Sequence, residues 1–181
     1  MPPNPSLNPP PPGMVVEVDR TTAARIIERH QTEAPVDVRA IAADFGINVY
    51  SVDLGENVSG VLRRGGEWAG PSGYVILVHR QHHLNRQRFT VAHELGHFVL
   101  HRSQVDEREI VQEDEFYRAF PGPLEREANN FAADVLMPWT LINRLSESGI
   151  KDLPGLALRL AVSKQALAVR LGLPYDQGGW E

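Results

Sequence analysis

Hydrophobic residues recur at helical spacing in two segments near the start of the chain. The first predicted helix begins at a Thr21 or Thr22 cap and runs to about Gln31. We expect Pro35 to open the second helix. The apolar face of that helix consists of Val38, Ile41, Ala42 and Phe45. Gly46 follows this face and suits the position just after a helix end, where a left-handed backbone is common.

Three shorter apolar runs follow, rich in β-branched and aromatic residues, and they predict strands over residues 47–52, 58–64 and 74–80. The segments between them contain several glycines and are short. Connections of this kind are typical of neighbouring antiparallel strands. The pattern therefore predicts a three-stranded antiparallel meander. Its last strand leads almost directly into the next helix, so we expect the two to lie side by side.

The second half of the chain returns to helical periodicity. Asn85 is the predicted N-cap of a helix that ends near Arg102. Pro123 suits the first position of another helix, which ends before Pro138 and carries a continuous apolar stripe with small alanines. A further helix is predicted over residues 139–148. These patterns together predict an α+β protein, with a small antiparallel three-stranded sheet packed on a mainly helical domain.

Residues 154–173 predict two short helices separated by a turn, the second capped by Ser163. Such a pair resembles a helix-turn-helix, which in DNA-binding proteins places its second helix in the major groove. Here the second helix carries only Lys164 and Arg170 as positive charges. We therefore favour a helical hairpin that closes the core, and DNA binding by this pair stays the alternative interpretation.

Composition narrows the classes of function. The 181-residue chain has a net charge of −5, which counts against nucleic-acid binding as its main activity. It has no cysteine, so disulfides and thiolate zinc sites are excluded and a metal would need histidine and carboxylate ligands. Residues 1–13 hold seven of the 14 prolines and predict a disordered tail, which leaves residues 14–181 as a single domain. We find no membrane-spanning run or signal peptide and expect a cytoplasmic protein.

The candidate chemistry centres on an H-E-x-x-H motif at residues 93–97. Four residues advance a helix by about 400°, so His93 and His97 share one face, about 6 Å apart along the axis. Two imidazoles at this spacing can bind one small metal ion. Glu94 lies about 100° around the helix and can act as a general base on a water molecule without being a ligand. Gly96 leaves room for a closely packed neighbour.

A hydrolytic zinc site needs three protein ligands and one open position. His101 shares the face of the motif but lies about 12 Å from His93 along the axis, so we expect it to pack or hydrogen-bond nearby. A later helix offers Glu125 and Glu127. Asn129 lies one turn after Glu125, where its amide can hold a ligand imidazole, so we favour Glu125 and keep Glu127 as the alternative. The remaining candidates are His79, His82 and His83.

Two segments, RFTVAHELGHFVLH (88–101) and EREANNFAADVLMP (125–138), together resemble the ImmA/IrrE family of metallopeptidases. The resemblance extends more weakly over residues 14–173. It implies a zincin-like fold of the gluzincin type, in which His93, His97 and Glu125 hold Zn²⁺ and Glu94 is the general base. Many members are similar in cleaving a helix-turn-helix repressor or antitoxin inside bacteria. The resemblance therefore implies such a substrate, and release of stress-response or mobile-element genes.

We accordingly expect a zinc-dependent endopeptidase. Candidates for a second donor to the developing oxyanion are Tyr74, Tyr117 and His101. The strand at 73–80 is expected to bind substrate as an added β-strand. A different class of function is a zinc-stabilised regulator whose terminal helices bind DNA or a repressor without hydrolysis. A third is one half of a toxin–antitoxin pair that acts by protein binding alone.

Overall fold

The computed structural model of the chain describes residues 19–108 and 122–174. The predicted tail at 1–13 and the candidate Tyr117 lie outside these ranges. In chain order the helices are α1 (Arg20–His30), α2 (Val38–Asp44), α3 (Leu84–Leu100), α4 (Arg102–Arg108), α5 (Gly122–Leu136), α6 (Trp139–Glu147), α7 (Leu153–Leu160) and α8 (Lys164–Arg170). The strands are β1 (Asn48–Val52), β2 (Gly60–Arg64) and β3 (Tyr74–His79). Within the described ranges, no helix combines the length and apolarity that crossing a bilayer requires.

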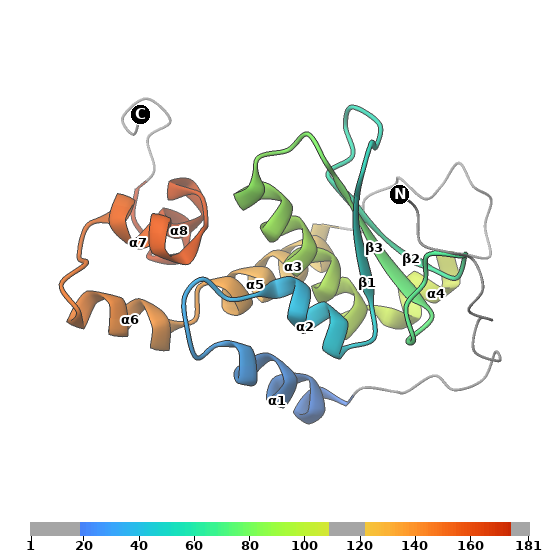
Figure 1. Cartoon of the computed structure of the whole chain (residues 1–181), viewed down its shortest axis with the longest axis horizontal. Coiled ribbons are helices and arrows are strands. Elements are labelled where there is room, and N and C mark those ends of the chain that lie inside the picture. Colours follow the sequence, from blue (N-terminus) through green and yellow to red (C-terminus); the bar gives the residue numbers. More distant parts are fainter. Residues whose placement is uncertain (1–18, 109–121, 175–181) are drawn as a thin grey trace.

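Helix α3 is the central element of the fold. It contacts β2 and β3 on one side and α5 on another, while α2 packs near it as well (Figure 1). Its apolar residues Val91, Leu95 and Phe98 are buried, which explains why a helix with polar residues on several sides is nevertheless held at the centre. The predicted α+β class, with a small sheet and mostly helices, is confirmed.

The predicted antiparallel meander is wrong. The strand order is β1-β3-β2, with β1 parallel to β3 and β2 antiparallel to β3, so the sheet is mixed. The strand with the most continuous apolar sequence, β3, is buried along most of its length and takes the centre. Short connections between strands predicted neighbours in sequence order. Instead, β1 and β2 lie on opposite sides of β3, although they follow each other in the sequence.

The caps of the first two helices are aspartates rather than the predicted residues. The carboxylate of Asp19 accepts hydrogen bonds from the backbone N–H groups of Thr21 and Thr22, and Asp37 does the same at the start of α2. The second helix therefore begins after Asp37 and not at Pro35. An ionised carboxylate accepts two N–H groups and also complements the helix dipole, which favours aspartate over threonine here. Gly46 adopts a φ of 72° just after α2, as predicted.

The ends of α3 differ slightly from the prediction. The ring of His83 accepts from the N–H of Asn85 and caps the helix, whereas the amide of Asn85 donates to the carbonyl of Val162 at 3.0 Å. The helix ends at Leu100, and α4 begins two residues later. The side chain of Asn85 thus connects α3 to the segment before α8.

Arg88, in the first half of α3, joins segments that are distant in sequence. Its guanidinium donates to the carbonyl of Val36 at 2.8 Å and to the carbonyl of Ala161 at 3.2 Å. Ala161 has a left-handed backbone at the end of α7 (φ 52°). An arginine near a helix N-terminus opposes the macrodipole, and these two carbonyl contacts account for its placement.

The last three helices follow the sequence prediction closely. Helix α6 covers the predicted span to within a residue, and Ser163 caps α8 by accepting from the N–H of Ala166. Leu156 and Leu160 of α7 and Leu167 of α8 belong to the hydrophobic core. The pair therefore buries apolar surface against the rest of the protein, as expected of a closing hairpin, and DNA binding by it stays the alternative interpretation.

Helices α3 and α5 approach each other closely at Gly96. A Cβ atom built on Gly96 would lie 3.1 Å from the Cα of Ala128 and 3.1 Å from a ring carbon of Phe131. Ala128 and Ala132 of α5 are fully buried. Small residues on both helices therefore set the distance between them.

We predict that Gly96→Val separates the two helices. A branched side chain cannot fit against Ala128, so we expect a loss of about 2 kcal/mol in the free energy of unfolding, as is typical of overpacked sites. Ala24→Val, on the exposed side of α1, adds two methyl groups to a helix without this contact and should change stability little. Chemical denaturation measures both. Equal stability of the two variants would contradict the close approach.

Candidate metal centre

Helices α3 and α5 bring the side chains of His93, His97 and Glu125 together, with one donor atom of each within 4.8 Å of the others. The two Nε2 atoms are 3.1 Å apart. The Nε2 of His93 lies 3.2 Å from Oε2 of Glu125, and the Nε2 of His97 lies 3.5 Å from Oε1. The two histidines come from one face of α3, as their spacing requires, and Glu125 comes from the first turn of α5.

These distances fit the donor triangle of a small metal ion. Tetrahedral zinc sites have ligand distances of about 2.0–2.1 Å, so two ligand atoms are about 3.3 Å apart. The Nε2–Nε2 separation of 3.1 Å and the two Glu125 contacts of 3.2 and 3.5 Å, which are made by different carboxylate oxygens, lie around this value. Two imidazole nitrogens and one carboxylate are also a donor set that catalytic zinc sites use. Both the geometry and the chemistry of this cluster therefore fit a divalent cation with a further position open to water.

The His93 ring is held from its other nitrogen. Its Nδ1 lies 3.0 Å from the side-chain oxygen of Asn129 on α5. An amide oxygen accepts, so this contact places the proton on Nδ1 and leaves the lone pair of Nε2 facing Glu125. The contact predicted between Asn129 and a histidine of this pair is confirmed.

The His97 ring is held by a chain of polar side chains that runs from the buried His101 to Glu127 at the surface. Its Nδ1 lies 3.0 Å from Nδ1 of His101, and Nε2 of His101 lies 3.0 Å from a carboxylate oxygen of Glu127. The carboxylate accepts from His101, so the Nδ1 of His101 can accept from His97. This leaves the lone pair of His97 on Nε2, which faces the cluster. His101 hydrogen-bonds nearby, as predicted, and Glu127 contacts His101 and is not part of the cluster.

Glu94 lies under β2, next to this cluster. Burial raises the pKa of its carboxyl group to about 8, the negative charge of Glu125 adds to this shift, and a hydrogen bond from the backbone N–H of Leu62 opposes it. Gly60 of β2 passes directly over α3. A Cβ atom there would overlap with the methyl group of Thr90 and lie 3.3 Å from Oε1 of Glu94. Glu94 is thus enclosed by a strand whose glycine allows the close contact.

The contacts of Gly60 and Leu62 with Glu94 were not predicted from the sequence. Gly60 is one of 15 glycines, and a backbone N–H has no sequence signature. The only signal in the sequence was that Gly60 lies inside the predicted strand 58–64, where a glycine often marks the close approach of another backbone.

The remaining candidates lie elsewhere. The hydroxyl of Tyr74 is buried and bonds with Asp106 and Arg102, so it does not reach the cluster as an oxyanion donor. His79 and His82 stack on each other at 4.7 Å between ring centroids. His83 caps α3. None of these three histidines is part of the His93 cluster in the residues that the structure describes.

Comparison with known proteins identifies a family and similar solved structures. The family model Peptidase_M78, described as the IrrE N-terminal-like domain, matches residues 42–172. A solved structure described as a Mycobacterium tuberculosis transcriptional regulator is similar to 87% of this chain, with a TM-score of 0.56 and 20% sequence identity. The matched region is 48% of that protein's chain, and at this identity the likeness shows the fold alone. No curated protein matches this chain significantly.

We predict that zinc binding at pH 7 releases about one proton fewer from Glu94→Gln than from the wild type. After removal of metal by a chelator, a carboxyl group with a pKa of about 8 is mostly protonated at pH 7. A nearby divalent cation favours the carboxylate, lowers the pKa and expels the proton. Calorimetry in buffers of different ionisation enthalpy measures the release.

The same experiment at pH 9 supplies the control. Above pH 8 the carboxyl group of the wild type is already ionised, so the difference between the two proteins should vanish. An equal proton release from both proteins at pH 7 would contradict the raised pKa.

We also predict that His101→Phe weakens zinc binding about ten- to hundred-fold, the usual cost of losing a group that orients a ligand histidine. Phenylalanine keeps the buried ring but removes the Nδ1 that accepts from His97. Glu127→Gln should cost less, because its amide oxygen can still accept from His101 and the side chain is 60% exposed. Competition with a chromogenic chelator gives the affinities. His30→Phe on α1 is the control, and an unchanged affinity in His101→Phe would contradict the assignment.

Proposed function

The chain belongs to the peptidase family of the IrrE N-terminal-like domain, and from this premise we propose that it is a zinc-dependent endopeptidase. The observation that supports this proposal most directly is the triangle of donor atoms from His93, His97 and Glu125, with the buried carboxyl group of Glu94 beside it. A metal-binding triad alone is compatible with a structural site. A buried carboxyl group next to the triad is the arrangement that hydrolysis needs.

His93, His97 and Glu125 would hold the zinc ion. When bound at such a site, zinc supplies Lewis acidity, which lowers the pKa of water and polarises a carbonyl oxygen. Asn129 and His101 keep the two rings in the tautomer that presents Nε2. This fixed orientation means that the side chains need little rearrangement when they bind the ion.

Glu94 would move the protons of the reaction. One of its carboxylate oxygens takes a proton from the attacking water and returns it to the nitrogen of the leaving amine. Burial under β2 raises its basicity, and the charge of a cation at the triad opposes that effect, so its pKa is brought towards the working pH. The enclosure also keeps bulk water away from the carboxylate.

We propose that substrate pairs with β2, in place of the strand first expected. β3 is paired on both sides and has no edge to offer. The N–H of His79 in β3 donates to the carbonyl of Ser59, and the N–H of Gly65 donates to the carbonyl of Gly73, just before β3. The intervening even-numbered residues of β2 therefore direct their backbone groups to the other side. Leu62 is one of these, and its N–H reaches Glu94. A substrate strand on this edge would pass beside Glu94, and backbone pairing would select little for side chains.

The substrate we propose is a helix-turn-helix repressor or antitoxin, whose cleavage would release stress-response or mobile-element genes. The family resemblance of the two motif segments supports this choice. The similar solved structure is itself described as a transcriptional regulator, which is consistent with a regulatory context. The competing functions, a non-hydrolytic regulator or a toxin–antitoxin component, predict binding to the same partner without cleavage.

We predict that Glu94→Gln keeps zinc but loses cleavage, by at least about a hundred-fold in rate, because an amide cannot accept the water proton. The test incubates purified protein with the helix-turn-helix regulator encoded beside its gene and follows new fragments by mass spectrometry. A chelator should prevent cleavage by the wild type, and added zinc should restore it. Glu28→Gln, an exposed change on α1, serves as the matched control. Undiminished cleavage by Glu94→Gln would overturn the proposal.

A further inference from the structure

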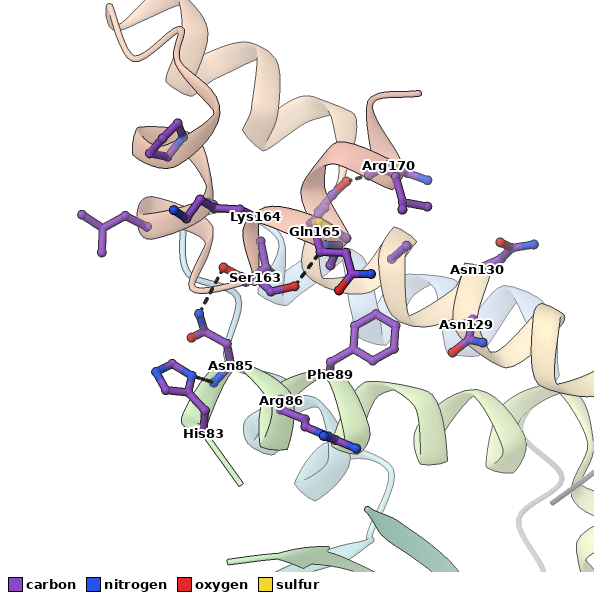
Figure 2. Close-up of a pocket in the computed structure, with 18 residues that line it drawn as sticks. His83, Asn85, Arg86, Phe89, Asn129, Asn130, Ser163, Lys164, Gln165 and Arg170 are labelled. Carbon is purple, nitrogen blue, oxygen red and sulfur yellow. Dashed lines mark hydrogen bonds between the residues drawn. The ribbon is translucent and has the colours of Figure 1, made fainter. Parts of the chain in front are cut away.

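A groove of about 1250 Å³ lies between the first half of α3, the middle of α5 and the α7–α8 pair (Figure 2). Its lining comes from residues 83–89, 129–137 and 154–170, which are far apart in sequence. Pockets for small molecules usually have volumes of roughly 300–1,000 Å³. This groove is larger and is bounded by helices, which suits a segment of another protein.

The side of the groove formed by α7 and α8 is apolar. Leu158 is 80% exposed and Val169 is 70% exposed, and with Leu84 (71%) they are the most exposed large hydrophobic residues in the described part of the chain. Leu158 and Val169 line the groove, as do Phe89 and Met137. Exposed aliphatic side chains gathered around one depression are a feature of binding surfaces. The groove therefore offers apolar contacts to its occupant.

The charge of the groove is positive, although the protein as a whole is negative. Arg86, Lys164 and Arg170 line it, and no aspartate or glutamate is among its described lining residues. The net charge of the chain is −5. Asp134 pairs with Arg170 at 2.7 Å, which offsets part of this charge. Complementary charge favours an occupant that carries carboxylates.

The groove is continuous with the candidate metal centre. Asn129 lines it and also holds the ring of His93. Arg86 lines it as well, and its guanidinium donates at 2.9 Å to the hydroxyl of Ser59, the residue before β2. One end of the groove thus reaches the cluster, and its edge reaches the start of the strand proposed to pair with substrate.

We propose that this groove binds a segment of the protein substrate rich in carboxylates and aliphatic side chains, at a distance from the scissile bond. The inference rests on the proposed peptidase function. Pairing with β2 selects little for side chains, so a second contact of defined charge and polarity supplies the specificity that the strand lacks. Leu158 and Val169 contact the aliphatic side chains, and Arg86 and Lys164 pair with the carboxylates.

The alternative occupant, nucleic acid, fits this surface less well. Arg170 was one of the two cations of the helix-turn-helix interpretation. It pairs with Asp134, donates to the carbonyl of Met137 and packs on the ring of Trp139. A phosphate contact would have to compete with these interactions. Phosphate binding also gains nothing from the exposed leucine and valine.

Fluorescence anisotropy with the Glu94→Gln protein tests the proposal independently of hydrolysis. The probe is a labelled peptide of about 16 residues with leucine at i, i+3, i+4 and i+7 and glutamate elsewhere. The reference peptide has lysine in place of every glutamate. We expect the acidic peptide to bind at least about ten-fold more tightly, and more weakly as salt is added. Equal affinity for the two peptides overturns the proposal.

Matched variants assign the binding to this groove. Lys164→Glu and Leu158→Ser should each weaken binding of the acidic peptide about five-fold or more. Lys151→Glu and Leu84→Ser make the same changes at exposed positions outside the lining and should leave the affinity unchanged. Binding that Lys164→Glu and Leu158→Ser do not affect overturns the assignment. A labelled DNA duplex that binds more tightly than the acidic peptide, and loses binding in Lys164→Glu, also overturns it.

The inference and the peptidase function can fail separately. In one outcome, wild type and Lys164→Glu cleave the regulator with the same zinc-dependent kcat/KM, and the acidic peptide does not bind. This result overturns the groove proposal alone. Groove-dependent peptide binding by a protein that cleaves nothing overturns the peptidase function and leaves the groove as a docking surface.

Discussion

The close approach of α3 and α5 is the constraint on which the rest of the site depends. His93 and His97 come from one helix and Glu125 from the other, so the donor triangle exists only at one distance between the helices. Gly96 against Ala128 sets that distance, because neither residue has a side chain that could hold the backbones apart. The same pairing brings Asn129 and Glu127 of α5 within reach of the histidines of α3. One packing contact thus positions both the donors and the groups that orient them.

The polar groups around the site also explain the direction in which each ring faces. A neutral imidazole has one protonated nitrogen and one with a free lone pair. A hydrogen-bond acceptor beside one nitrogen places the proton there and leaves the lone pair on the other. Asn129 provides that partner for His93, and His101 provides it for His97. His101 in turn donates to the carboxylate of Glu127, whose side chain is 60% exposed. The orientation of the buried His97 ring is therefore coupled to a group at the surface.

Local sequence patterns predicted the parts of the site that a single helix determines. His93 and His97 share a face at any i, i+4 spacing, and the preference for Glu125 over Glu127 followed from Asn129 one turn away. The sheet could not be predicted in the same way. Its order depends on which strand the core covers most completely, and that strand is β3, which is buried along most of its length and lies at the centre. The close approach at Gly60 could not be predicted for a related reason, since it depends on contact with Thr90, thirty positions later in the sequence.

The position of β2 connects the burial of Glu94 to the pairing that we propose for substrate. The strand passes over α3 at Gly60, and this passage removes Glu94 from water and raises its pKa. Because β2 is also an edge strand, its outward backbone groups, apart from the Leu62 N–H that bonds to Glu94, form the edge that we propose pairs with substrate. A change that moved β2 away from α3 would therefore lower the basicity of the carboxylate and displace the pairing edge at the same time. The raised pKa of Glu94 and the proposed alignment of substrate thus depend on the same feature, the close passage of β2 over α3 that Gly60 allows.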